Sequence, residues 1–174
     1  TYTKYISKTN TACRPIFSDA ASAILISKSA KNKIGPFELG ADGSGADALE
    51  LPTGTNEIVM NGAKVLTFAM DVVPNNVNKL LKKIKIDKKN IHKFIFHQAS
   101  KYILDNINRR LSIEKNKTFE NYGKVGNTIS ASIPIALKDA YTKRKILVNK
   151  NIIVAGYGVG LSWGSALIKW SKLL

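Results

Sequence analysis

The hydrophobic residues in the middle of the chain recur at the spacing of amphipathic helices. Residues 61–85, 100–113 and 131–145 each carry apolar side chains three or four positions apart, which places them on one face of a helix. Pro74 should kink or divide the first helix, because proline lacks the N–H of a helical hydrogen bond. Pro134 should be tolerated in the first turn of the third helix. The pattern therefore predicts three helical segments.

Shorter apolar runs predict strands before and after these helices. Residues 91–97 (IHKFIFH) form one such run, and residues 152–160 and 161–170 form two more, joined by a glycine-rich turn. The first thirty residues are expected to be extended, with a strand at residues 1–7. Residues 37–54 predict a strand that runs into a long loop, because Gly, Asp and Pro are frequent there.

From residue 91 onward the predicted order is strand, helix, helix, strand, strand, with a loop at residues 118–128 between the two helices. This order is typical of an α/β fold in which helices cover a mixed β-sheet. A chain of 174 residues with 44% hydrophobic residues is long enough to bury one sizeable core. We therefore expect one compact α/β unit without internal repeats.

One nearly uncharged segment, Ile152–Ile168, carries glycines four residues apart, a spacing at which membrane helices pair. The segment is somewhat short for a membrane span, and its glycines and two serines divide it into two apolar runs. Two buried strands explain it better than a membrane helix.

The formal charge of +15 comes mainly from lysines spread along the chain. It is compatible with attraction to an acidic partner, and also with a solvated, lysine-rich surface. The densest run, residues 79–89, alternates lysine with leucine and isoleucine, as on the polar face of a helix. No aromatic residues lie between these lysines to stack on bases, so nucleic acid is not favoured as a partner.

Cys13 is the only cysteine, so an internal disulfide and a cysteine pair at metal-ligand spacing are both excluded. We expect a reducing, cytoplasmic setting. The first thirty residues lack a secretory signal pattern, and because the first residue is Thr1 we expect a piece of a longer protein. Asp42 and Asp47 lie in a glycine-rich loop that lacks the acidic ladder of a calcium site, so no metal is expected.

Candidate chemistry lies at three junctions between predicted elements. His97 ends the strand at residues 91–97, and in open α/β sheets reactive groups gather beyond the carboxyl ends of strands. Asn127 precedes small hydroxyl residues that enter a helix (GNTISASIP), and the turn in YGVGLSWG offers backbone amides that can point at an anion. A histidine at a strand end is more often structural, an interpretation we keep for His92. Asn127 alternatively serves as a helix cap.

Together, the motifs HQAS, GNTISASIP and AGYGVGLSWGSALIKW resemble the C-terminal half of β-ketoacyl-acyl carrier protein synthase III, a thiolase-fold condensing enzyme. FSDAASAIL is similar to the family's glycine-rich FGDGAGA segment, and MNGAKVLTFA to its helix after the substrate loop. The resemblance implies that residues 29–174 form the C-terminal thiolase-like domain. Residues 1–28 would be the end of the preceding N-terminal half, with strands only.

The resemblance implies the reaction of that family, an acyl transfer in fatty acid biosynthesis. An acyl-CoA condenses with malonyl-acyl carrier protein in a Claisen reaction that releases carbon dioxide. It also implies the absence of a cofactor, an acidic acyl carrier protein as partner, and a homodimer of the full-length protein.

Several residues acquire roles through the same resemblance. His97 and Asn127 would be the catalytic hydrogen-bond donors, and the backbone N–H of Val159 would contribute to an oxyanion hole. Lys101 would meet the carrier protein. The residues expected to contact CoA or its pantetheine arm are Gly62, Ala63, Ala99 and Ser100.

The sequence also departs from the family pattern. The family's nucleophilic cysteine belongs to the N-terminal half, and Cys13 cannot replace it because Cys13 lies just before the FGDGAGA-like segment. The chain alone should therefore be inactive. Ser18 and Ala20 replace two glycines of that segment, which should alter the packing beneath the site. Ser100 stands where an asparagine usually contacts pantetheine, and Tyr102 where a basic residue usually meets the carrier protein.

Other functions share the histidine and asparagine pair. The enzymatic alternatives are 3-hydroxy-3-methylglutaryl-CoA synthases, plant-type polyketide synthases, and relatives that transfer acyl groups to oxygen or nitrogen acceptors. The HQA and GNT motifs favour synthase III. A non-catalytic thiolase-fold subunit is the alternative from another class.

Overall fold

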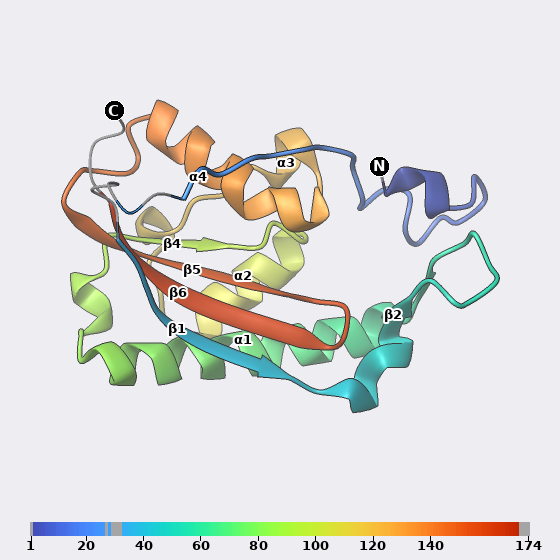
Figure 1. Cartoon of the computed structure of the whole chain (residues 1–174), viewed down its shortest axis with the longest axis horizontal. Helices are drawn as coiled ribbons and strands as arrows, with labels where there is room; N and C mark the ends of the chain where they lie inside the picture. The colour runs from blue at the N-terminus through green and yellow to red at the C-terminus, as the bar shows by residue number, and fades with distance from the viewer. Residues whose placement is uncertain (1, 27, 29–32, 171–174) are drawn as a thin grey trace.

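The centre of the molecule is a four-stranded mixed sheet, seen in a computed structural model that describes residues 2–26, 28 and 33–170 (Figure 1). The strand order is β1-β6-β5-β4. β4 runs parallel to β5, whereas β6 is antiparallel to both of its neighbours. The strands of this sheet are β1 (Lys33–Ala41), β4 (Lys93–Phe96), β5 (Lys150–Gly158) and β6 (Ser162–Trp170). A separate two-stranded sheet pairs β2 (Leu49–Glu50) with β3 (Val59–Met60).

Helices cover both faces of the sheet. α1 (Gly62–Ile84) and α2 (Lys101–Arg110) lie on one face, and α4 (Ser132–Thr142) lies on the other (Figure 1). A short helix, α3, spans Tyr122–Val125. Among the described residues, five 3-10 helices occupy the connections, at Thr3–Tyr5, Gly43–Ala48, Lys88–Asn90, Lys115–Lys117 and Ile129–Ala131. The arrangement confirms the predicted α/β class with a mixed sheet covered by helices.

β4 is buried on both of its faces, which explains its nearly continuous apolar sequence. Successive side chains of a strand point to opposite faces of the sheet. Phe94 and Phe96 accordingly pack into the core beneath α1 and α2, whereas Ile95 packs into the core beneath α4. A third apolar cluster, which includes Ile6 and Phe17, joins the N-terminal segment to β2 and β3.

The predicted division of the first helix at Pro74 is wrong, because α1 continues from Gly62 to Ile84 with Pro74 inside it. Its start is fixed by Asn61, whose side-chain oxygen accepts the N–H of Lys64 at 3.0 Å. Its end is at Lys85, which adopts the left-handed conformation of a helix C-terminus. Pro74 is itself buried, so packing of the helix against the sheet offsets the hydrogen bond that proline cannot make.

The predicted strand at residues 1–7 is also wrong. The segment forms a 3-10 turn at Thr3–Tyr5, in which the N–H of Tyr5 donates to the carbonyl of Tyr2. The carboxylate of Asp19 accepts the N–H groups of Tyr2 and Thr3, at 2.6 and 2.9 Å, and this stabilises the turn. Local hydrogen bonds therefore replace the ladder of a strand.

The run of small residues after Ser18 is exposed to solvent. Residues 18–26 belong to no strand, and Ile24, Leu25 and Ile26 are all largely exposed. The proposed domain boundary at residues 28 and 29 stays a prediction, because residues 29–32 lie outside the described residues. The loop expected at residues 118–128 contains α3, which was missed.

The apolar segment Ile152–Ile168 forms the antiparallel pair β5 and β6, as predicted. Within the described ranges, none of the helices has both the length and the hydropathy that crossing a bilayer requires.

The turn between β5 and β6 is held by the loop that follows β1. Asp42 and Leu161 exchange two backbone hydrogen bonds, each 2.8 Å long. The side chain of Leu161 packs directly over Gly45, where a Cβ atom would lie 2.4 Å from Leu161 Cδ1 and 2.9 Å from its Cγ. Gly45 therefore provides the space that seats the turn.

We expect Gly45→Ala to lower the free energy of unfolding by about 1–3 kcal/mol, since the added methyl group must displace a packed leucine. Gly43 lies in the same 3-10 helix, and a Cβ there meets nothing within 4 Å. Gly43→Ala should therefore leave the free energy of unfolding within about 0.5 kcal/mol. Urea unfolding followed by tryptophan fluorescence measures both. Equal values for the two variants would contradict the packing role of Gly45.

Candidate active site

His97 lies directly after β4, where its backbone N–H donates to the carbonyl of Ala155 in β5 at 2.9 Å. Its Nδ1 atom is 2.6 Å from the hydroxyl oxygen of Ser132, the first residue of α4. The ring also packs edge-on against Tyr157, with 5.3 Å between centroids. Burial lowers the pKa of His97 from 6.5 to about 4, so the imidazole is neutral at pH 7.

Asn127 is buried and is fixed through both its backbone and its side chain. Its N–H donates to Ile16 and its carbonyl accepts the N–H of Ser18, which forms a parallel bridge to Phe17. Its side-chain oxygen accepts the N–H of Ile129 at 3.0 Å. A backbone N–H can pair only with this oxygen, so the amide NH₂ group faces away and remains a donor. The alternative interpretation of Asn127 as a helix cap is wrong, because the N-cap of the 3-10 helix at Ile129–Ala131 is Thr128 and that of α4 is Ala131. The bond from Ile129 is that of an Asx turn, and it leaves the amide as a donor.

Ser18, which stands where the resemblance places a glycine, packs against Gly126. Gly126 adopts a φ of +68°, and a Cβ on it would lie 2.0 Å from the hydroxyl oxygen of Ser18. Glycine at position 126 accommodates both the left-handed backbone and the larger serine.

Val159 occupies the turn between β5 and β6 and is half exposed. Its carbonyl accepts a hydrogen bond from the hydroxyl of Ser162 at 2.8 Å. Together with the reciprocal bonds between Asp42 and Leu161, this contact defines the direction of the backbone in the turn.

These three junctions meet at one cavity of about 580 Å³, a size that suits small-molecule ligands. His97, Asn127 and Val159 all line it, as predicted from the sequence. Most other lining residues are apolar and come from β1, β3, α1, α2, α4 and β6: Leu39, Met60, Val65, Phe68, Ile103, Ile133 and Trp163. No charged side chain of the described residues lines the cavity, so its polar contacts come from neutral groups.

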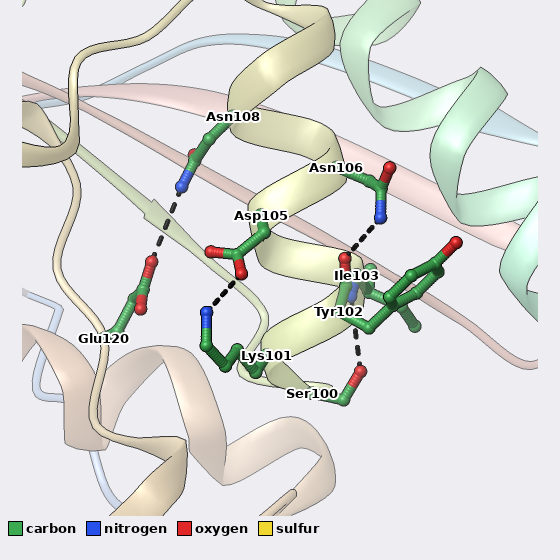
Figure 2. Close-up of polar contacts among 8 residues, drawn as sticks. All are labelled: Ser100, Lys101, Tyr102, Ile103, Asp105, Asn106, Asn108 and Glu120. Atoms are coloured by element: carbon green, nitrogen blue, oxygen red, sulfur yellow. Dashed lines mark hydrogen bonds and ion pairs between the residues drawn. The ribbon is translucent and has the colours of Figure 1, made fainter.

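The residues predicted to contact pantetheine divide into two groups. Gly62, Ala99 and Ser100 line the cavity, whereas Ala63 is not among its lining residues. Ser100 is also the N-cap of α2, where its hydroxyl oxygen accepts the N–H of Ile103 at 3.4 Å (Figure 2). The pantetheine role of all four stays a prediction.

Lys101 lies outside the cavity, on the exposed surface of α2. Figure 2 shows its ammonium group directed at the carboxylate of Asp105, one helical turn later. This ion pair raises the pKa of Lys101 and competes with any acidic partner for its charge. Tyr102, which stands where the family has a basic residue, points to another side of the helix and is exposed (Figure 2).

Cys13 is fully buried and is not one of the cavity residues. It packs with Ile6, Phe17 and Ile58, and its backbone N–H donates to the side chain of Asn10. Burial raises the pKa of its thiol, which disfavours the reactive thiolate. The position agrees with the expectation that Cys13 is not the nucleophile.

Sequence reasoning assigned no role to three residues around His97. Ser132 contacts its Nδ1 atom, and Tyr157 packs against its ring with a buried hydroxyl that lacks a partner in the described residues. Gln98 is fully buried and bonds to the carbonyl of Phe96 and the N–H of Asn121, which fastens the loop before α3. In the sequence, Ser132 is marked only by its position five residues after Asn127, and Tyr157 only by its glycine neighbours. Such spacing does not reveal which side-chain atoms come into contact.

The comparisons with known proteins agree with this geometry. The sequence model of the family described as 3-oxoacyl-[acyl-carrier-protein (ACP)] synthase III C terminal matches residues 81–170, more than half of the chain. The β-ketoacyl-[acyl-carrier-protein] synthase III of Staphylococcus epidermidis is 32% identical over 97% of the chain. The enzyme of that name from Natranaerobius thermophilus is 42% identical over 77% of the chain.

A solved structure shows the same likeness. The crystal structure of 3-oxoacyl-(acyl carrier protein) synthase III from Pseudomonas aeruginosa aligns over the whole chain with a TM-score of 0.88 and 27% identity. The chain covers 56% of that protein, and 54% and 45% of the two enzymes above. It thus spans about half the length of the relatives it matches. The chain belongs to the 3-oxoacyl-[acyl-carrier-protein] synthase III family and corresponds to the C-terminal half of its members.

Proposed function

We propose that the protein containing this chain condenses an acyl-CoA with malonyl-acyl carrier protein to give a 3-oxoacyl thioester. The observation that supports this proposal is the placement of His97, Asn127 and the Val159 turn around one uncharged cavity. Relatives of the chain carry the name of this activity. No cofactor is needed for the reaction.

The bond that breaks first joins the malonyl carboxylate to its neighbouring carbon. As carbon dioxide leaves, the electron pair forms an enolate whose negative charge rests on the thioester oxygen. The N–H at Nε2 of His97 and the amide NH₂ of Asn127 would donate to that oxygen. Such fixed donors lower the barrier because they are already aimed at the oxygen on which charge develops.

The enolate carbon then attacks the carbonyl of an acyl group held as a thioester on a cysteine outside this chain. The backbone N–H of Val159 would stabilise the resulting oxyanion. Collapse of this oxyanion breaks the carbon–sulfur bond to the cysteine, which leaves as a thiolate. Gly62, Ala99 and Ser100 line the cavity at positions that suit the pantetheine arm, whose apolar and amide groups match an uncharged wall.

The proposal extends to partners and setting. The chain has 27 basic and 12 acidic residues, and the resulting positive charge would attract an acidic carrier protein, with Lys101 as one contact. The full-length protein would be a homodimer. The single cysteine supports a cytoplasmic setting.

We expect Asn127→Ala in the full-length protein to slow decarboxylation of the malonyl thioester by about 100-fold or more, because one enolate donor is lost. Acylation by acyl-CoA should change no more than a few-fold. Release of ¹⁴C-labelled carbon dioxide and mass spectrometry of the acyl-enzyme measure the two steps. Asn116→Ala, at an exposed asparagine of the 3-10 helix Lys115–Lys117, serves as the control.

His97→Ala should give the same pattern of a slow decarboxylation and a nearly normal acylation. If both variants decarboxylate normally but are not acylated, the pair serves the nucleophile, and the roles proposed here are wrong.

We expect the chain by itself to show no condensing activity, since its one thiol, Cys13, is buried away from the cavity. Incubation with acyl-CoA followed by mass spectrometry should find Cys13 acylated more slowly than free N-acetylcysteine. Cys13→Ser provides the baseline. A stable adduct that forms faster than on the free thiol would refute this expectation.

His97 should stay neutral from pH 8 down to about pH 5, because its pKa in the folded protein is about 4. The unfolded chain binds this proton near pH 6.5, so His97 makes stability rise with pH between about 4 and 6.5. NMR titration of its ring signals measures the pKa directly. A midpoint near 6.5 would show that the ring is solvated and not held in the buried site.

A further inference from the structure

The hydroxyl of Ser132 lies behind the imidazole of His97. Ser132 is only 1% exposed, and its oxygen is 2.6 Å from Nδ1, a short hydrogen bond between residues 35 positions apart in the sequence. Such a contact requires either that the hydroxyl donates to Nδ1 or that Nδ1–H donates to the hydroxyl. The two arrangements leave opposite chemistry at Nε2, because a neutral imidazole carries one proton.

The surroundings of Ser132 decide between the two arrangements. The backbone N–H of Gln98 also points at the serine oxygen, at a longer distance of 3.5 Å. A hydroxyl that accepts from this N–H keeps its hydrogen for another acceptor, and Nδ1 is the acceptor within reach. If Nδ1–H were the donor, the serine hydrogen would need a different acceptor, and the described residues offer it none.

We propose that Ser132 is a positioning residue whose hydroxyl donates to Nδ1 of His97 and so holds the proton on Nε2. The tautomer follows from the geometry alone, whereas its importance for catalysis rests on the proposed function. With the proton on Nε2, His97 donates to a developing oxyanion. With the proton on Nδ1, it would present a lone pair to that oxyanion and repel it.

Ser132 is not explained as a helix cap. The N-cap of α4 is Ala131, and no side chain of the described residues caps this helix end. The positive end of the α4 dipole, at Ser132, also disfavours a charged imidazolium at His97. The serine and the helix end therefore act together on the same ring, one selecting the tautomer and the other the neutral state.

The second histidine, His92, provides an internal reference for determining the tautomer of His97. His92, just before β4, accepts the N–H of Leu147 at its Nε2 atom, at 3.1 Å. Neutral His92 must therefore carry its proton on Nδ1, opposite to the tautomer assigned to His97. One spectrum should show both tautomers.

The test uses the full-length protein labelled with ¹⁵N only in histidine, at pH 7.5. Long-range ¹H–¹⁵N correlation spectra distinguish a protonated from an unprotonated ring nitrogen, and His92→Gln and His97→Gln assign the two rings. We expect Nε2–H for His97 and Nδ1–H for His92. An Nδ1–H tautomer at His97 in the unaltered protein would overturn the proposal without any variant of Ser132.

Ser132→Ala should shift the His97 nitrogen signals toward a mixture of tautomers and leave those of His92 unchanged. Ser165→Ala is the matched control, because Ser165 is also buried but its hydroxyl bonds to nothing in the described residues. Ser165→Ala should leave the nitrogen signals of both histidine rings unchanged. An unchanged His97 pattern in a folded Ser132→Ala protein would overturn the proposal.

Decarboxylation in the same variants separates this inference from the proposed function. Ser132→Ala should slow it about ten-fold or more, with no further loss when His97 is already alanine. A shifted tautomer with unchanged decarboxylation would support the positioning role of Ser132 and contradict the catalytic role of His97. A slowed reaction with an unshifted tautomer would contradict the positioning role.

Discussion

The parallel pairing of β4 with β5 is the constraint on which the rest of the site depends. β4 is buried on both faces, so each of its backbone groups needs a partner within the protein. The ladder with β5 supplies partners along one edge of β4, as far as the bond from the N–H of His97 to Ala155. Along the other edge, a bridge to Thr118 and the side chain of Gln98 supply them. Tyr157, which packs on the imidazole, lies two positions after Ala155. The register of one strand pair therefore sets the distance between His97 and the Val159 turn.

Pairs of reciprocal backbone hydrogen bonds fix the positions of the loops around the site. Asp42 and Leu161 exchange two bonds at the β5–β6 turn, and residues 16 and 18 form two with Asn127. Each pair fixes a loop in distance and direction without adding a charged side chain to the cavity. A site assembled in this way stays uncharged, so its few donors act in a medium of low polarity.

The sequence predicted those parts of the fold in which a periodic pattern is long. The structure contains the elements predicted from the helical spacing before and after Pro74, from the apolar run of β4 and from the two glycine-rich strands. Packing of α1 in the core outweighs the helix-breaking tendency of Pro74. The strand predicted for the N-terminal segment is wrong because alternating tyrosine and threonine is compatible with a strand, whereas the carboxylate of Asp19 stabilises a turn. α3 has four residues, too few for a period to appear.

The two histidines show why residue type alone could not define the site. His92 precedes β4 and His97 follows it, so they stand at opposite ends of the same strand. The pKa of His92 is lowered mainly by burial and then by the charge of Lys93, and its Nε2 atom is used by a backbone N–H of Leu147. Burial alone lowers the pKa of His97, with no charged group of the described residues contributing. Its Nδ1 atom faces the hydroxyl of Ser132, and it lines the cavity. Because β4 and β5 run parallel, the amino end of β4 lies beside the loop that leads into β5, whereas its carboxyl end lies beside the residues that line the cavity, and the chemistry of each imidazole follows from which end it occupies.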